Sequence, residues 1–220
     1  MRRVIGGMFV SLDCVIQAPG GPVEDPTGGF AHGGWMFPVA DDQVGAAIGD
    51  FFSKPYDLLL GRRTYDIFAA YWPYVDGDGA AMGEAFTAAN KYVLTSGEQP
   101  LPWANSHRMR DIDDIAMLKQ GDGPDLLIQG SSTIYPALLA AGLLDRMVLY
   151  TFPIVLGSGK RLFGKGTPSG TLKLVDHQVS AGGTIIATYE PVGSLETGSF
   201  GAITSAREDV RQAKMKDGTW

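Results

Sequence analysis

The segment DLLLGRRTYDIF, residues 57–68, contains residues suited to binding a phosphate group. Arg62, Arg63 and Thr64 follow a short apolar strand and fall in the first turn of a predicted helix, where backbone N–H groups are free and the helix dipole is positive. Two guanidiniums and a hydroxyl would add charge-assisted hydrogen bonds to an anion. The alternative is that both arginines form surface ion pairs with carboxylates. A doubled arginine at this place in a chain of net charge −6 favours phosphate.

A second turn of this kind follows the apolar segment DLLIQG, residues 125–130. Gly130 would let a ligand approach the backbone, and residues 131–133 (SST) would expose N–H groups and hydroxyls. Two such turns in one sheet suit a dinucleotide. The GxGxxG fingerprint of many dinucleotide sites is absent, since its best match, GSGKRL at residues 157–162, lacks the third glycine.

A third strand end, in KYVLTS at residues 91–96, adds the hydroxyls of Thr95 and Ser96. If this strand lies next to the strand that precedes Arg62, Ser96 and Arg62 could hold one phosphate between them, at the carboxyl edge of a parallel sheet. The alternative is an ordinary turn, because Thr and Ser are common where strands end.

Two carboxylates, Asp41 and Asp42, follow the segment WMFP at residues 35–38 and begin a predicted amphipathic helix. One of them would cap the helix and the other would face a pocket. The alternative is that neither does more than cap the helix or face solvent.

Metal and hydrolase sites are not indicated. The three histidines are far apart in sequence, and the single cysteine, Cys14, rules out a CxxC motif and an intramolecular disulfide. GxSxG, the signature of many serine hydrolases, is absent. Cys14 lies in an apolar run, so we expect its thiol to be buried and unreactive.

Net charge, apolar stretches and cysteine content limit the binding partners and the cellular compartment that we expect. A net charge of −6 argues against nucleic-acid binding by general electrostatic attraction. No stretch approaches the roughly 18 apolar residues of a membrane span, so we expect no membrane partner. The cysteine usage favours a reducing compartment, and we expect a cytoplasmic location.

Alternating strands and helices must position these residues. Strands are predicted at residues 3–10, 57–61, 91–95, 125–130, 146–157, 172–176 and 184–190, and helices at 41–51, 64–72, 80–90, 112–119 and 132–142. Helices between the early strands and none between the last two predict an α/β fold. Its central sheet would be mainly parallel and would end in a C-terminal antiparallel hairpin. The Gly/Pro-rich residues 17–34 are predicted to form a long loop, which is often functional.

We predict one domain over residues 1–192, followed by a linker and a short helix over residues 193–220. Ser205 and Glu208 form a capping-box pattern, and the helix would run to about Lys216. Because its apolar stripe is thin, a frayed tail and an arm that contacts a second copy are both open.

The chain resembles dihydrofolate reductase and, more closely, the reductase (RibD C-terminal) domain of riboflavin biosynthesis and its stand-alone relatives. The resemblance covers roughly residues 3–190 and consists of five segments in the family's order: SLDCVI, LLLGRRTY, YVLTS, LLIQGSSTIY and LLAAGLLDRMVLYTFPIVLGSGKRLF. It implies a dihydrofolate-reductase-like three-layer sandwich. One cysteine cannot supply the zinc ligands of the riboflavin enzyme's deaminase partner, so only a stand-alone reductase is compatible.

The resemblance also implies that NADPH binds across the sheet. Ser96 would lie at its 2′-phosphate and residues 130–133 along its pyrophosphate. The expected cofactor-binding residues are Gly61, Arg62, Arg63, Thr64, Thr95, Ser96, Gln129, Gly130, Ser131, Ser132 and Thr133.

On the substrate side, the resemblance makes Asp41 or Asp42 the catalytic carboxylate, assisted by Thr151, because Trp35 and Pro38 resemble the WxLP element of dihydrofolate reductase. The expected substrate-binding residues are Asp13, Trp35 and Thr151. The implied activity is NADPH-dependent reduction of a small heterocyclic (pterin or pyrimidine-like) or carbonyl substrate by a homodimer. The alternative is a dimeric nucleotide-binding protein without catalysis.

Overall fold

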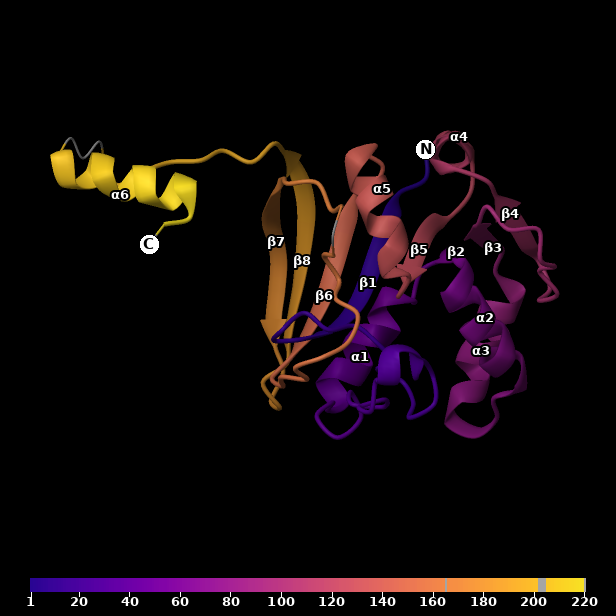
Figure 1. Ribbon diagram of the computed structural model, residues 1–220. Helices are drawn as coiled ribbons and strands as arrows, with labels where there is room; N and C mark the ends of the chain where they lie inside the picture. The colour runs from indigo at the N-terminus through magenta and orange to yellow at the C-terminus, as the bar shows by residue number, and fades with distance from the viewer. Residues whose placement is uncertain (165, 202–204, 220) are drawn as a thin grey trace.

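A computed structural model describes residues 1–164, 166–201 and 205–219. Its body is built on one eight-stranded sheet with the strand order β4-β3-β2-β5-β1-β6-β8-β7 (Figure 1). The strands are β1 (Val4–Ser11), β2 (Tyr56–Gly61), β3 (Lys91–Leu94), β4 (Ser106–Met109), β5 (Asp125–Gln129), β6 (Arg146–Phe152), β7 (Thr171–Val179) and β8 (Ile185–Gly193). The α-helices are α1 (Asp42–Phe51), α2 (Arg62–Tyr71), α3 (Ala80–Ala88), α4 (Ile112–Gln120), α5 (Tyr135–Ala140) and α6 (Ala206–Asp217), with short 3-10 turns η1 (Thr27–Gly29), η2 (Trp72–Tyr74), η3 (Gly77–Gly79) and η4 (Ser132–Ile134).

Strands β1 to β6 are parallel to one another, whereas β8 is antiparallel to both β6 and β7. This confirms the predicted mainly parallel sheet with an antiparallel C-terminal hairpin. The sequence predicts no strand where β4 lies, because its residues, SHRM, have no apolar alternation. Pairing with β3 at the sheet edge is what makes this segment a strand.

Helices cover both faces of the sheet, so the body has three layers (Figure 1). Helices α4 and α5 pack on one face, where Leu59 of β2 joins the same apolar cluster as Ile115 and Tyr135. The neighbours of Leu59 in β2, Leu58 and Leu60, face the other side and pack with residues of α2 and α3. Helix α1 lies on that second face as well, over β1 and β6.

Two adjacent glycines in β1 let helices from both faces approach the strand closely. A Cβ added to Gly6 would overlap the hydroxyl of Tyr135 in α5. One added to Gly7 would lie 2.8 Å from Cζ of Phe51 in α1 and 3.1 Å from the side-chain oxygen of Gln129. The middle of β1 is therefore packed against α5 on one face and against α1 on the other.

Helix α6 lies away from the body, beyond a linker that begins after β8 (Figure 1). The Ser205 hydroxyl accepts a hydrogen bond from the amide of Glu208 at 3.2 Å, as the capping-box pattern predicts. No described residue of this helix is buried, so α6 adds nothing to the core. No helix within the described ranges is long and apolar enough to cross a bilayer.

Candidate nucleotide and substrate site

The two turns that were predicted to bind phosphate lie side by side at the carboxyl edge of the sheet. They follow β2 and β5, which are adjacent and parallel. The amide of Gly61 donates to the Ser131 hydroxyl at 2.9 Å, and the amide of Ser131 donates to the Thr64 hydroxyl at 3.1 Å. The turns therefore form one unit held by reciprocal hydrogen bonds.

The N-terminus of α2 differs from the prediction in one respect. The helix predicted over residues 64–72 begins two residues earlier, at Arg62, and Gly61 rather than Thr64 occupies the cap position, without a side-chain hydrogen bond. The Thr64 hydroxyl accepts from Ser131, and no side chain in the described part of the chain caps the free N–H groups of the first turn. These groups stay available for an anion.

The turn after β5 has a left-handed backbone at two successive residues. Gly130 has φ 76° and Ser131 has φ 58°. Left-handed backbone is rare for a residue with a side chain, and such strain is common at ligand sites. Of the other residues expected here, Ser132 is partly buried and Thr133 is exposed, whereas Gln129 lies over β1 beside Gly7.

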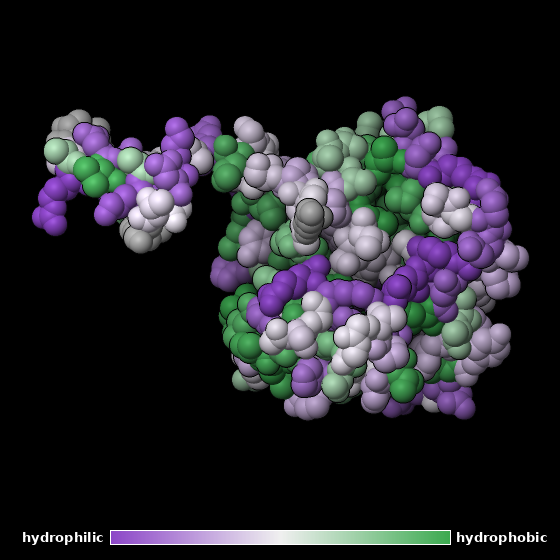
Figure 2. Space-filling model, viewed as in Figure 1, coloured by the Kyte–Doolittle hydropathy of each residue, from purple (hydrophilic) through white to green (hydrophobic). Residues whose placement is uncertain are grey.

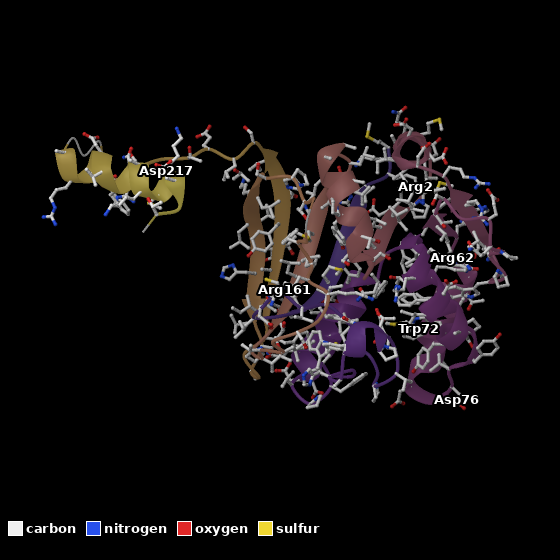
Figure 3. The ribbon with its side chains drawn as sticks, in the orientation of Figure 1. Arg2, Arg62, Trp72, Asp76, Arg161 and Asp217 are labelled. Carbon is white, nitrogen blue, oxygen red and sulfur yellow. The ribbon has the colours of Figure 1, made fainter. Side chains whose placement is uncertain are left out.

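The two arginines of the α2 turn lie on either side of it. Arg62, labelled in Figure 3, donates to the Asp66 carboxylate at 2.9 Å and to the Gln99 carbonyl at 3.0 Å. Arg63 donates to Asp25 at 3.3 Å, and its side chain is 60% exposed. The predicted alternative of surface ion pairs is thus realised, yet both guanidiniums remain beside the phosphate-suited turn. The partly exposed Arg62–Asp66 pair contributes only about 0–1 kcal/mol, so a phosphate could replace Asp66, whereas the Asp25 side chain is buried.

The third strand end also lies where the sequence places it. β3 pairs with β2, and Leu94 is in register with Gly61, so Thr95 and Ser96 follow directly beside the α2 turn. The Thr95 hydroxyl accepts a hydrogen bond from the amide of Gly97 at 3.1 Å. Ser96 is exposed, which leaves it accessible to a ligand.

Asp13 connects the loops that follow β1 and β6. Its carboxylate accepts hydrogen bonds from the Ser11 hydroxyl and from the amides of Leu156 and Gly157. The Ser11 hydroxyl and the two amides lower the pKa of Asp13 to about 2, so it is ionised at neutral pH. The guanidinium of Arg161, labelled in Figure 3, lies 3.7 Å away. Asp13 thus joins the loop that follows β1 to the loop that follows β6.

The neighbouring Cys14 differs from the prediction. It is exposed rather than buried, and it lies just beyond β1 in a turn with φ 64°. The apolar residues around Cys14 are typical of a strand, but the left-handed turn rotates its side chain out of the strand pattern.

Trp35 and Thr151 lie on opposite faces of the sheet. The Trp35 indole donates to the Gln17 carbonyl at 2.8 Å, and its ring packs edge-on against Phe152. Phe152 faces α1, so Thr151, the preceding residue of β6, points to the α5 side. The structure therefore does not bring Thr151 to Asp41 and Asp42 at the start of α1.

The carboxylate of Asp41 has a structural role. Its carboxylate accepts from the amide of Val44 at 3.0 Å, which caps α1, and from the amide of Gly182 at 2.6 Å, in the turn between β7 and β8. These bonds, the one from Gly182 first, lower the pKa of Asp41. Because β8 lies three strands from β5, Asp41 is roughly 14 Å along the sheet edge from the Ser131 turn. Asp42 is exposed in the first turn of α1.

A cavity of about 300 Å³ lies between the 17–34 loop and the glycine-rich loop at residues 158–160. Its lining consists of Gln17, Thr27, Gly28, Phe30, Ser158, Gly159 and Lys160. The Lys160 ammonium pairs with the Asp25 carboxylate, which also accepts from Arg63. Asp25 therefore connects this cavity to the α2 turn.

No local pattern in the sequence marks this cluster. Asp25 and Lys160 are 135 positions apart, and only the GSGK segment, noted as a weak GxG match, marked one side of the cavity. No group of three or more acidic, histidine or cysteine side chains within the described part of the chain could hold a metal ion.

Comparison with known families shows which family the chain belongs to. Residues 2–186 match the RibD C-terminal domain family. The chain belongs to this family. Among curated relatives, it is 24% identical over 191 residues to the uncharacterized protein YyaP of Bacillus subtilis (strain 168), covering 86% of this chain and 94% of YyaP.

Solved structures show the same fold. A candidate riboflavin biosynthesis protein from Shewanella sp. PV-4 superposes with a TM-score of 0.63 at 20% identity, covering 86% of this chain and 99% of that one. A pyrimidine reductase-like protein from Corynebacterium diphtheriae gives 0.54 at 15% identity, with 87% and 92% covered. Dihydrofolate reductase from Enterococcus faecalis, complexed with NADP(H), gives 0.54 at 16% identity, with 86% and 96% covered. The fold is therefore dihydrofolate-reductase-like, as the sequence resemblance implies.

Proposed function

We propose that this RibD C-terminal domain protein is an NADPH-dependent reductase of a small heterocyclic or carbonyl substrate. The observation that carries the proposal is the pair of hydrogen-bonded turns, Gly61–Thr64 and Gly130–Thr133, at adjacent parallel strand ends. Together they offer free amides, hydroxyls and two guanidiniums at the carboxyl edge of the sheet, which is where open α/β sheets bind nucleotides.

Different residues of the site would contact different parts of the cofactor. The amides of the α2 turn and of Ser132 and Thr133 would hold the pyrophosphate, with Arg62 and Arg63 supplying positive charge. Ser96 and Thr95, one strand further out, would lie on the adenosine side, and Gln129, over β1, on the nicotinamide side. Bound NADPH would supply the hydride for the reduction.

The cavity between the 17–34 and 158–160 loops suits the substrate. About 300 Å³ is at the lower end of small-molecule sites, and Phe30 offers an apolar wall beside the polar groups of Gln17 and Lys160. Trp35 and Asp13 would act indirectly, since one bonds Gln17 and the other holds the loop that leads to Lys160. Asp41 and Asp42 remain the proposed sources of a proton.

One observation favours the second candidate, a nucleotide-binding protein without catalysis. Asp13 and Asp41 both accept several hydrogen bonds and both have lowered pKa values, so neither carries a proton to give at neutral pH. In this alternative the turns bind the nucleotide and no hydride transfer follows.

A turnover assay separates the two functions. Purified protein is mixed with NADPH and, in turn, with dihydrofolate and a pyrimidine-type substrate, and the loss of NADPH is followed by its absorbance. The reductase proposal expects substrate-dependent consumption of NADPH. Saturable NADPH binding without consumption for any substrate of these classes would instead support the non-catalytic function.

We also propose that the protein is a homodimer and that α6 contributes to the contact, since this helix has no buried residue of its own. Deleting residues 194–220 is then expected to lower the mass measured by light scattering to that of a monomer. An unchanged dimer mass would remove the helix from the interface, and a monomeric full-length protein would remove the dimer.

A further inference from the structure

A second cavity, of about 490 Å³, lies between α3, the turn η2 that follows α2, and the residues just before β4. Figure 3 labels Trp72, one of its lining residues, at the far end of α2 from Arg62. The ten residues of α2 span roughly 15 Å, and another lining residue, Asn105, precedes the amino end of β4. The cavity is therefore separate from the phosphate turns, which lie at the carboxyl ends of the strands.

Close packing holds the walls of this cavity in place. A Cβ added to Gly83 of α3 would lie 2.4 Å from the carbonyl oxygen of Trp72 and 2.8 Å from Cγ1 of Val75, so α3 directly contacts the chain that follows α2. The Trp72 ring packs edge-on against Phe86 of α3, with 4.9 Å between the ring centroids. The two walls thus keep a fixed separation without a ligand.

Much of the lining is apolar or aromatic. Trp72 is only partly buried, and Pro73, Val75 and two alanines of α3 line the cavity with it. In Figure 2 the surface over α2 and α3, at the lower right, is mostly apolar or weakly polar. An accessible indole is the side chain that best attracts a cation to its ring face.

The polar groups of the lining are mainly hydrogen-bond acceptors. Glu84 is exposed and is the one charged residue among the described residues of the lining. The side-chain amide of Asn105 donates to the carbonyls of Thr87 and Ala88 at 3.3 and 3.1 Å, so its oxygen is left as an acceptor. The Thr87 hydroxyl already accepts from the Trp103 indole at 3.1 Å. A ligand that donates hydrogen bonds therefore fits this lining better than one that accepts them.

The charge around the cavity is negative. Residues 64–90, which form α2, α3 and the turns between them, contain four acidic residues and no Lys, Arg or His. The next cation along the chain, Lys91, lies outside the lining and is fully buried, with its ammonium on the carbonyls of Phe86 and Thr87. A carboxylate and a carbonyl oxygen next to an indole attract a cation with N–H donors and repel an anion.

We propose that this cavity binds an organic ammonium ion, a primary amine on a small apolar or aromatic body. The ammonium group donates to Glu84 and Asn105, and the body packs against Trp72. This site is distinct from the proposed nucleotide and substrate sites, and the inference does not depend on the proposed function. A surface hollow that holds only water is the competing explanation.

The test uses three probes of similar shape that differ in charge at neutral pH. Phenethylamine is a cation, phenethyl alcohol is neutral and phenylpropionate is an anion. Ligand-observed NMR titration of the full-length protein gives the dissociation constant of each probe.

Three variants locate the binding. Glu84→Gln removes the charge from the lining, and Ala104→Trp fills the cavity from an exposed lining position. Asp78→Asn is the matched control, because it removes one exposed carboxylate from the same segment but outside the lining. Circular dichroism and a thermal melt establish that each variant is folded. If Ala104→Trp does not fold, Ala88→Trp fills the cavity from another exposed lining position.

Phenethylamine is expected to bind about 3- to 30-fold more tightly than phenethyl alcohol, the range for one exposed ion pair together with one cation–π contact. Phenylpropionate should not bind detectably. Glu84→Gln should weaken phenethylamine by about 2- to 5-fold and leave the alcohol unchanged. Asp78→Asn should leave both probes as they are in the wild type, and Ala104→Trp should abolish the binding of both.

Absence of phenethylamine binding up to about 10 mM, or equal affinity for the three probes, would overturn the proposal. Amine binding that survives the cavity-filling variant would show that the probe binds elsewhere, which also overturns it. Binding that is lost in the filled cavity but unchanged in Glu84→Gln, or weakened equally by Asp78→Asn, would contradict the assigned ammonium contact.

Discussion

The amide of Gly61 donates a hydrogen bond of 2.9 Å to the hydroxyl of Ser131, although 70 positions separate the two residues. Gly61 ends β2 and Ser131 follows β5, so this bond and its reciprocal, from the Ser131 amide to Thr64, join the two candidate phosphate turns. Gly61 and Ser131 are both buried. The shape of one turn therefore depends on the presence of the other.

Replacing Ser131 with Ala should destabilise the protein and weaken NADPH binding together. The change leaves the buried amide of Gly61 without its acceptor, which costs about 1–3 kcal/mol. Urea denaturation measures the first effect and fluorescence titration the second. Ser132→Ala removes a neighbouring hydroxyl for which the structure shows no hydrogen bond, and it should leave stability within about 0.5 kcal/mol of the wild type.

The contact between β1 and α5 gives a second prediction. Gly6→Ala should cost about 1–3 kcal/mol because its methyl group overlaps the hydroxyl of Tyr135. That hydroxyl is fully buried without a hydrogen-bond partner in the described part of the chain, so Tyr135→Phe should be neutral or slightly stabilising.

A double-mutant cycle in urea tests this contact. The two changes share one contact, so Gly6→Ala should cost less in the Tyr135→Phe background than in the wild type. If the two changes in the free energy of unfolding are strictly additive, the added methyl group does not overlap the hydroxyl. It would then overlap another group, for example the ring carbons of Tyr135 alone.

Alanine variants of Asp41 and Asp42 should differ from each other in thermal stability and in turnover. Asp41→Ala removes the α1 cap and the bond to the β7–β8 turn, so its thermal midpoint should fall by several degrees, whereas Asp42→Ala should melt like the wild type. Since the pKa of Asp41 is lowered, its contribution is present above about pH 4 and is lost as the pH falls further. An Asp41→Ala variant with an unchanged midpoint and no turnover would instead support a catalytic role.

Lys91 should make stability depend on pH in the alkaline range. Its side chain is fully buried, donates to the carbonyls of Phe86 and Thr87, and lies over the ring of Trp103. Burial lowers its pKa from 10.5 to about 8. Between these values the unfolded chain binds the proton and the folded protein does not, so the free energy of unfolding should rise with pH.

A Lys91→Met variant isolates this effect. The wild type should gain about 1–3 kcal/mol relative to the variant between about pH 8 and pH 10, as measured by chemical denaturation. Parallel pH profiles of the two proteins would show that Lys91 keeps an ordinary pKa.

The sequence predicts the positions of the two candidate phosphate turns because the signals for strand ends are local. A short apolar run that ends in glycine marks β2 and β5, and the alternation of helices and strands implies that their carboxyl ends share one edge. The joint role predicted for Ser96 and Arg62 requires that β2 and β3 are adjacent, and the two strands do pair.

The substrate side could not be predicted in the same way because its contacts join distant loops. Asp41 shows a cap signal in the sequence, but its second partner, Gly182, is 141 positions away. Lys160 and Asp25 meet only after the sheet has formed.

Titrating purified protein with NADPH and following tryptophan fluorescence tests the central claim, that the joined turns bind a dinucleotide. The account predicts saturable quenching at micromolar concentrations, weaker binding of NADH, and loss of affinity in Ser131→Ala. Absence of saturable binding up to high micromolar NADPH would contradict it.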